Sequence, residues 1–276
     1  MMSNDNDEFR EFERVGWERV AESYQRSFLQ LTAQTIDPLL EAVDIRNCRS
    51  LLDVACGPGH VAARALELVP QVAALDISEA MIRMASTAYP EIEFRQGDAE
   101  NLPYPDASFD AVVMNFGMLH LAHPHRSVRE ACRVLKPGSR FAFSVWATPD
   151  ISRGFGIILR AVEEQGSLDV GLPEGPSFFL FSDHTASRQV LDESGFKDVR
   201  FSQVDMSWRL GSGEEFFEAF YNGSARTGAL LRAQSEQALL RIRAAVLGEL
   251  AALAKEPSGS IEVAMSAIVA SAAKGL

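Results

Sequence analysis

The sequence predicts a doubly wound α/β fold around a mostly parallel, seven-stranded sheet. Short apolar segments alternate with amphipathic segments five times between residues 50 and 146, a pattern typical of βαβ units. Two later segments, 197–204 and 261–270, are expected as further strands and can complete the sheet. The length of 276 residues, 47% of them hydrophobic and 23% charged, suffices for one large core with an added lobe.

The elements follow in order along the chain. Residues 9–43 carry apolar side chains at near-helical spacing and predict two helices, with Asp37-Pro38 able to start a last short one. The first five strands are expected after these helices, at 50–55, 72–75, 92–95, 109–114 and 140–146. The helices between them are expected at 60–69, after the capping residue Ser78, and at 127–135.

The second half of the chain predicts added helical segments. Residues 147–185, rich in Pro, Gly, Ser and Phe, form an expected insertion over the sheet edge with a helix at 154–165. A helix at 185–194 and helices at 213–222 and 228–254 follow. The expected domains are a helical cap (1–45), the core (46–146), a lid (147–186) and the rest of the core (187–276), with a helical insertion at about 205–256.

Composition argues against several classes of protein. The net charge of −12, without a basic run, disfavours nucleic acid as a partner. Three scattered cysteines without CxxC spacing argue against disulfides or structural zinc, and His123 and His125 lack a third metal ligand. No apolar stretch is long enough for a membrane span, and the amino-terminal residues are polar. We expect a cytoplasmic protein with no metal.

A glycine turn between the first strand and its helix indicates a ligand site. Gly57 and Gly59 allow a tight turn and close approach of a ligand, and their spacing fits the loose dinucleotide fingerprint. Asp53, in the strand, would repel a pyrophosphate but attract an ammonium or sulfonium group. Asp76 ends the second strand, where an acid can accept from ribose hydroxyls. A ligand with a ribose and a cation fits S-adenosylmethionine better than a nicotinamide dinucleotide.

Four sequence blocks carry a family resemblance: DVACGPG (53–59), LDIS (75–78), GDAENLPYPDASFD (97–110) and REACRVLKPGSRFAFS (129–144). Together they resemble the class I S-adenosylmethionine-dependent methyltransferases, particularly the small-molecule group that includes the ubiquinone and menaquinone biosynthesis enzymes. Ala55 stands where the family's E/D-x-G-x-G-x-G motif has its first glycine. The resemblance implies a Rossmann-like sheet that binds S-adenosylmethionine and releases S-adenosylhomocysteine.

The resemblance also implies a set of cofactor contacts. Along the methionine part these are Asp53, Ala55, Cys56, Gly57 and Gly59; around the adenosine, Asp76, Ile77, Met81, Gly97, Asp98 and Ala99; toward the substrate, Asn115, Phe116 and His120; and from the amino-terminal helix, Trp17 and Tyr24. Met81 and Phe116 could instead be core residues, Asp98 a turn residue, and the aromatic pair could simply pack the helix onto the sheet.

Catalytic and acceptor contacts are less determined by the sequence. His120 follows the fourth strand, so its imidazole could take a phenol or enol proton near neutral pH, or could be a loop residue without chemistry. Phe179, His184 and Tyr221 lie in the covering segments and are candidate substrate contacts. The many aromatic residues of these segments fit either a lid over a hydrophobic or aromatic acceptor or the core of an added lobe.

The expected function is methyl transfer to a small-molecule acceptor, with oxygen favoured and carbon or nitrogen open. A non-catalytic, cofactor-binding or regulatory protein of the same fold is an alternative, because methyl transfer requires no obligatory side chain. A nicotinamide-dependent oxidoreductase is disfavoured by Asp53 and by the lack of a Tyr-x-x-x-Lys pair.

Overall fold

The computed structural model describes residues 2–255 and 259–276. Its main sheet has the strand order β3-β2-β1-β4-β5-β10-β6, with β1 to β5 parallel and β10 antiparallel to both β5 and β6. The doubly wound α/β fold is therefore confirmed. These strands are β1 (Ser50–Val54), β2 (Gln71–Asp76), β3 (Glu93–Gln96), β4 (Phe109–Asn115), β5 (Leu135–Trp146), β6 (Phe196–Val204) and β10 (Ala267–Lys274).

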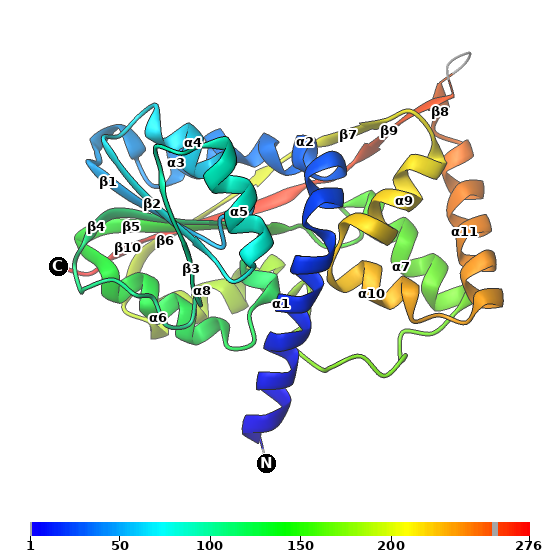
Figure 1. Ribbon diagram of the computed structural model, residues 1–276, viewed down its shortest axis with the longest axis horizontal. Helices are drawn as coiled ribbons and strands as arrows, with labels where there is room; N and C mark the ends of the chain where they lie inside the picture. The colour runs from blue at the N-terminus through cyan, green and yellow to red at the C-terminus, as the bar shows by residue number, and fades with distance from the viewer. Residues whose placement is uncertain (1, 256–258) are drawn as a thin grey trace.

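Helices cover both faces of this sheet (Figure 1). One face carries α3 (Ile36–Ala42), α4 (His60–Leu66) and α5 (Glu79–Ala88), and the other carries α6 (Pro124–Val134) and α8 (His184–Glu193). Because both faces are covered, central strands such as β1 are apolar almost throughout and fully buried. The start of α5 is capped as expected, since the Ser78 hydroxyl accepts a hydrogen bond from the Met81 amide at 3.2 Å.

The amino-terminal helix α1 (Met2–Ser27) is followed by α2 (Leu29–Thr32) and the 3₁₀ turn η1 (Ala33–Thr35). Helix α1 packs against α5 on one side and against α9 and α10 of the late insertion on the other. Figure 1 shows it crossing the molecule between the sheet and the insertion. The helix thus lies against both parts of the chain that border the carboxyl edge of the sheet.

The late insertion contains α9 (Gly213–Gly223), α10 (Arg226–Arg232) and α11 (Glu236–Ala251), and α7 (Arg153–Gln165) packs against α11. The expectation of one helix at 228–254 is wrong, because the Ser235 hydroxyl accepts from the Ala238 amide and starts a new helix. The insertion also holds a small sheet of β7 (Ser207–Leu210), β9 (Ser260–Ala264) and β8 (Ala254–Lys255) that the sequence analysis does not predict.

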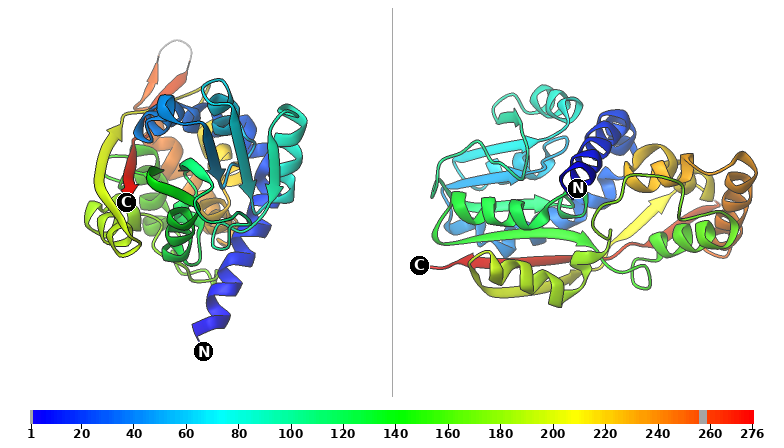
Figure 2. Two further views of the ribbon diagram at one scale, coloured as in Figure 1. Left: turned by 90° about the vertical axis from the view of Figure 1, so that its left-hand side faces the viewer. Right: turned by 90° about the horizontal axis from the view of Figure 1, so that it is seen from below.

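The expected strand at 261–270 is also two strands. Its first half, β9, pairs with β7 and β8 in the small sheet, whereas its second half is part of β10 in the main sheet. The chain changes sheets at Met265 and Ser266, and the right-hand view of Figure 2 shows the yellow and red segments passing side by side into the insertion. Main sheet and insertion share one hydrophobic core, which joins Phe141 and Phe143 to Phe216 and Phe220.

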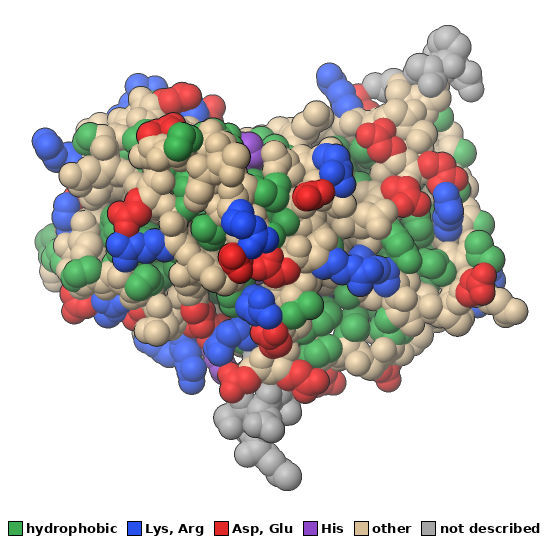
Figure 3. All heavy atoms as spheres, viewed as in Figure 1, with side chains coloured by type: hydrophobic (Ala, Val, Ile, Leu, Met, Phe, Trp, Pro, Cys, Tyr) green, Lys and Arg blue, Asp and Glu red, His purple; other side chains and the backbone are tan. Residues whose placement is uncertain are grey.

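The molecular surface is mixed in charge on the face that Figure 3 shows, where Lys and Arg side chains alternate with Asp and Glu. Among the described helices, none combines the length and the apolar character that crossing a bilayer needs. Residues 2–255 and 259–276 contain no group of three or more His, Cys, Asp or Glu placed to hold a metal ion.

Candidate functional site

A cavity opens at the carboxyl ends of β1, β2 and β4, where ligands bind in open α/β sheets. Helix α1 forms one wall, and the start of α10 and the segment after α7 form another. Most of the expected site residues line it: Trp17, Tyr24, Asp53, Ala55, Cys56, Gly57, Asp76, Ile77, Met81, Gly97, Asp98, Ala99, Asn115, Phe116 and His120. The cavity therefore gathers side chains that are spread over more than 100 residues of sequence.

The glycine turn after β1 has left-handed backbone at three positions, Ala55 (φ 55°), Gly57 (φ 52°) and Gly59 (φ 87°). A Cβ built on Gly57 would meet nothing within 4 Å, so this turn leaves open space on the cavity side. Gly59 does not line the cavity. A Cβ there would lie 2.8 Å from the Phe94 ring, so this glycine is required for packing against β3.

Asp53 is completely buried at the centre of the sheet edge. Its Oδ2 accepts from the Ala62 amide at 3.1 Å, whereas Oδ1 has no hydrogen-bond partner among the described residues. Burial raises the pKa of this carboxyl well above its ordinary value. A buried carboxylate oxygen without a donor is costly, so a cationic ligand that supplied one would be held strongly.

Asp76, at the end of β2, is oriented by two backbone amides. Its Oδ2 accepts from Gly57 at 2.8 Å and its Oδ1 accepts from Ser78 at 2.9 Å. Burial raises the pKa of Asp76, and the hydrogen bonds from these amides oppose the rise. Each carboxylate oxygen keeps a further lone pair, so the side chain can still accept from ligand hydroxyls.

The loop after β3 brings Asp98 and Ala99 to the cavity, and a side chain of α1 contacts this loop. The Asp98 Oδ1 accepts from the Glu100 amide at 2.8 Å. Arg10 of α1 donates to Glu100 at 2.6 Å, and its Nε lies 3.5 Å from Asp98 Oδ2. Glu100 in turn accepts from the His123 amide at 2.7 Å. Asp98 is thus paired with a cation of this chain, a contact that the sequence analysis does not anticipate.

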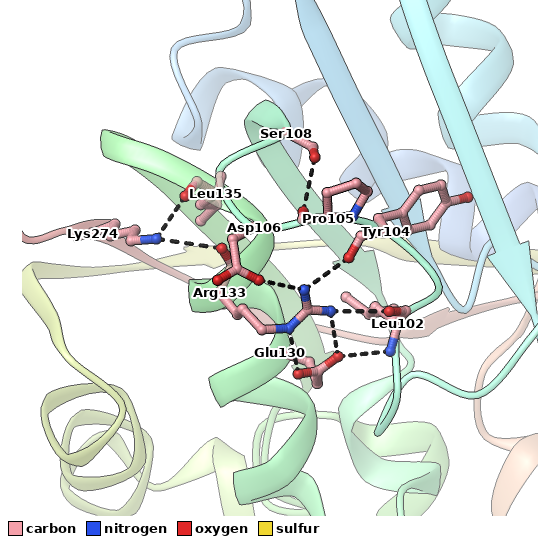
Figure 4. A network of polar contacts seen from close by, with 9 residues as sticks. All are labelled: Leu102, Tyr104, Pro105, Asp106, Ser108, Glu130, Arg133, Leu135 and Lys274. Atoms are coloured by element: carbon pink, nitrogen blue, oxygen red, sulfur yellow. Dashed lines mark hydrogen bonds and ion pairs between the residues drawn. The ribbon is translucent and has the colours of Figure 1, made fainter.

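The continuation of this loop is fixed to α6 (Figure 4). Arg133 donates to the Tyr104 carbonyl at 2.8 Å, to the Leu102 carbonyl at 3.0 Å and to the Asp106 carboxylate at 2.8 Å. Glu130 pairs with Arg133 and accepts from the Leu102 amide at 2.8 Å. The Arg133 guanidinium therefore fixes the backbone of residues 102–106, which leads back to β4.

Asn115, at the end of β4, is committed to structural hydrogen bonds. Its Oδ1 accepts from Thr35 at 2.7 Å and from Ser144 at 2.5 Å, and its Nδ2 donates to the Thr32 carbonyl at 3.3 Å. The side chain thus ties the amino-terminal helices to β4 and β5. Beside it, Phe116 stacks on Trp146 with ring centroids 4.2 Å apart, and both line the cavity.

Helix α1 and the turn after β4 meet at His120. Its Nδ1 lies 2.9 Å from Glu13 Oε2, and its ring packs edge-on against Trp17 at 4.8 Å. Tyr24, seven residues after Trp17, contacts that indole at 5.4 Å, and its hydroxyl bonds with the Thr32 hydroxyl at 3.0 Å. Burial raises the pKa of Tyr24 to about 12, so this phenol is a poor proton acceptor near neutral pH.

The three expected substrate contacts do not line the cavity. Phe179 packs behind Phe178 at 5.0 Å, His184 stacks on Phe201 at 4.2 Å beside β6, and Tyr221 stacks on Phe217 at 6.1 Å. Most aromatic residues of the insertion are core: Trp208, Phe216, Phe217 and Phe220 are all buried. Phe155, which is also buried, and Phe178 both come from the 147–185 segment and reach the cavity wall.

Sequence reasoning missed several residues of the cavity wall, namely Arg10, Glu13, Phe28, Thr32, Trp146, Ser224, Arg226 and Thr227. They come from segments whose approach to the sheet edge depends on tertiary packing. A local signal existed only for Glu13, an acid in the otherwise apolar stripe of α1 that Phe9 and Val20 share.

The chain is similar to known methyltransferases. A family model described as a methyltransferase domain matches residues 52–143, which run from β1 into β5. A demethylmenaquinone methyltransferase of Paenarthrobacter aurescens is 29% identical over 177 residues, or 60% of this chain and 69% of that protein. A ubiquinone/menaquinone biosynthesis C-methyltransferase of Pseudomonas entomophila is 36% identical over 119 residues, or 40% and 46%. The chain spans about half the length of several such relatives.

A solved structure supports the fold over nearly the whole chain. It is a phosphoethanolamine N-methyltransferase of Haemonchus contortus in complex with phosphomonomethylethanolamine and S-adenosylhomocysteine. The TM-score is 0.57 at 16% identity, with 97% of this chain and 60% of that chain covered. The residues matched by the family model include Asp53, Asp76 and Asp98, which line the cavity.

Proposed function

The chain belongs to the class I S-adenosylmethionine-dependent methyltransferases, and on that premise we propose that it methylates a small, apolar acceptor with an acidic hydroxyl. The observation that carries the proposal is the cavity itself. It combines a buried, half-partnered carboxylate at one end with aromatic walls and an imidazole at the other. We further propose a cytoplasmic setting, in keeping with the free thiols of Cys48, Cys56 and Cys132.

The described residues fit this cofactor. The Asp53 Oδ1 lacks a donor and would accept from the ammonium of the methionine part, which would lower the cost of burying that carboxylate. The open turn at Gly57 leaves room for the same part of the cofactor. Asp76 would accept from the ribose hydroxyls, with Ile77 and Met81 against the adenosine. Asp98 and Ala99 would meet the adenine, provided that Arg10 shares the Asp98 carboxylate.

The acceptor space is aromatic. Phe28, Phe116, Trp146, Phe155 and Phe178 line the part of the cavity that faces the insertion. Such walls favour a flat or branched apolar acceptor, which they would desolvate together with its reacting group. This composition supports a hydrophobic or aromatic small molecule.

The acceptor atom is where the sequence expectation and the relatives differ. The sequence analysis favours oxygen, whereas the Pseudomonas relative is named a C-methyltransferase. A phenol or enol that has lost its proton can react at the oxygen or at the ring or vinyl carbon bonded to the C–O carbon, so one acidic hydroxyl serves both outcomes. We therefore propose the phenol or enol class and leave the atom to be read from the product.

Methyl transfer requires the protein mainly to align the acceptor with the cofactor and to exclude water. When bound, S-adenosylmethionine supplies an electrophilic methyl group on a sulfonium. The aromatic walls align the acceptor for an in-line approach and exclude water. His120 is placed to take the acceptor proton, since it lines the cavity and an imidazole can act as a general base.

The test has two steps. Calorimetric titration with S-adenosylmethionine, S-adenosylhomocysteine and NADH, repeated on Asp76→Ala, should give micromolar binding of both adenosyl ligands that weakens in the variant, and no binding of NADH. A screen of phenols, hydroquinones and enols with methyl-labelled cofactor should then give a labelled product, whose NMR spectrum identifies the methylated atom. Binding without turnover of any acceptor would favour the non-catalytic alternative, and binding of NADH alone would overturn the cofactor assignment.

A further inference from the structure

Glu13 is a buried acid that lies between buried apolar side chains of α1. Its residue is 3% exposed, between Phe9 at 0% and Val20 at 1% on the same stripe of α1. Burying a carboxylate is costly unless polar partners are present, more so than burying a neutral polar group. Packing alone would favour an apolar residue here, so the partner of Glu13 explains its presence better than the helix does.

That partner is His120, at 2.9 Å between Glu13 Oε2 and His120 Nδ1. An ionised carboxylate can only accept, so the bond places the imidazole proton on Nδ1 and leaves a lone pair on Nε2. Among the described residues, Nε2 has no hydrogen-bond partner, while the ring lines the cavity. Trp17 at 4.8 Å and Phe178 at 6.1 Å hold the ring edge-on from two sides.

Three charged groups from different elements surround this imidazole. Glu13 contacts it from α1, and Asp76 interacts with it electrostatically from β2. Arg226, at the start of α10, donates to the Leu119 carbonyl next to it at 3.4 Å and interacts electrostatically with Glu13. Two carboxylates against one guanidinium favour a positive charge on the ring once it accepts a proton.

We propose that Glu13 is a positioning residue that holds His120 as the proton acceptor for the hydroxyl of the methyl acceptor. The proposal rests on the proposed function and names the groups that perform its proton transfer. His120 Nε2 takes the hydroxyl proton, and the electron pair left on the acceptor forms the bond to the methyl carbon. The carbon–sulfur pair stays with sulfur, which becomes a neutral thioether, and the positive charge ends on the imidazolium beside Glu13.

The matched variants are Glu13→Gln and Glu11→Gln on the same helix, the latter removing an exposed ion pair with Arg14. We expect Glu13→Gln to lower kcat/KM by about 10- to 100-fold and to move the acidic limb of the pH–rate profile to lower pH. The affinity of Glu13→Gln for S-adenosylhomocysteine should stay within about threefold of the wild-type value, because the Glu13 carboxylate acts through its contact with the His120 ring. Glu11→Gln should match the wild type in all three measurements.

A readout without any ligand completes the test. Nitrogen-15 NMR of the histidine-labelled protein should show neutral His120 protonated at Nδ1, and Glu13→Ala should shift it toward the Nε2-protonated form. A wild-type ring protonated at Nε2 would overturn the proposal. The proposal would also be overturned if Glu13→Gln lowered ligand affinity and kcat/KM equally and left the pH profile unchanged. The Glu13–His120 contact would then only join α1 to the turn after β4. Failure of the proposed function would look different: ligands bind and Nδ1 carries the proton, but no acceptor is methylated.

Discussion

Replacing Asp53 by Asn should stabilise the protein in the absence of ligand while weakening its hold on the cofactor. Within residues 2–255 and 259–276, Asp53 Oδ2 has one donor, the Ala62 amide, and Oδ1 has none. Asn keeps an oxygen for Ala62 and exchanges a buried charge for a neutral amide. We expect Asp53→Asn to raise stability by about 1–2 kcal/mol, since an unmatched buried polar group costs roughly 1–3 kcal/mol and more when it is charged.

The opposite sign is expected for binding. A hydrogen bond to a charged group contributes about 1.5–3 kcal/mol. At 1.4 kcal/mol for each factor of ten, Asp53→Asn should weaken S-adenosylhomocysteine by about 10- to 100-fold. Calorimetry measures this loss of affinity. Thermal unfolding measures the expected gain in stability, as a rise of about 2–4 °C in Tm for each kcal/mol.

The pH dependence adds a second signature. Burial raises the pKa of Asp53 in the folded protein, so the unfolded chain releases this proton at lower pH than the folded one. Below an ordinary Asp pKa of about 4 the carboxyl is protonated in both states and costs nothing. As the pH rises from there through the raised pKa, the folded protein loses stability. The Tm advantage of Asp53→Asn should therefore be near zero at low pH, grow with pH, and then level off.

Two results would refute this reasoning. One is a Tm difference between variant and wild type that is the same at every pH, because the charge of Asp53 would then carry no cost. The other is wild-type affinity of Asp53→Asn for S-adenosylhomocysteine, because the carboxylate would then not meet the ammonium. Saturating S-adenosylhomocysteine should also flatten the pH dependence of the wild type, since the ligand cation compensates the buried charge.

Three further outcomes follow from other contacts. Gly59→Ala should lower stability by about 1–3 kcal/mol in thermal unfolding, because its left-handed backbone and the Phe94 ring both oppose a Cβ. Asn115→Ala should cost about 1–3 kcal/mol in denaturant unfolding, since it leaves buried hydrogen-bonding groups without their shared partner. Glu18→Ala should cost about 1 kcal/mol and speed hydrogen exchange at the start of α5, because Glu18 accepts from the amides of Glu79 and Ala80 there, each at 2.8 Å.

The parts of the fold that the sequence predicts are those with local causes. Ser78 before an amphipathic segment predicts a cap, and the cap forms. The first five strands show their apolar segments because helices bury both faces of the sheet. The residues of the glycine turn, Asp53 and Asp76 belong to one short stretch, so their convergence could be inferred from the βαβ connection alone.

The missed parts depend on distant contacts or on uninformative patterns. Asn115 is expected in the site and lines the cavity, but its hydrogen-bond partners Thr32 and Thr35 lie 80 or more residues away and are not predicted. The segment from Ile261 to Ala270 is mostly apolar on both sides of Ser266 and contains no glycine or proline, so no strong local signal marks its change of sheet. Ser235 did carry a local cap signal, but the Ala and Leu content of the surrounding helices concealed it.

The paired passage between the two sheets has a consequence for how such an enzyme can change. Strands β6 and β10 lie side by side in the main sheet, and their continuations β7 and β9 lie side by side in the small one. The chain therefore leaves the main sheet before residue 207 and returns to it after residue 264 at neighbouring positions, where the Met265 amide donates to the Met206 carbonyl at 2.9 Å. A segment whose two ends are already joined can be lengthened, shortened or exchanged at little cost in chain entropy. New acceptors could thus be accommodated by grafting this module, while the strands that hold the cofactor stay as they are.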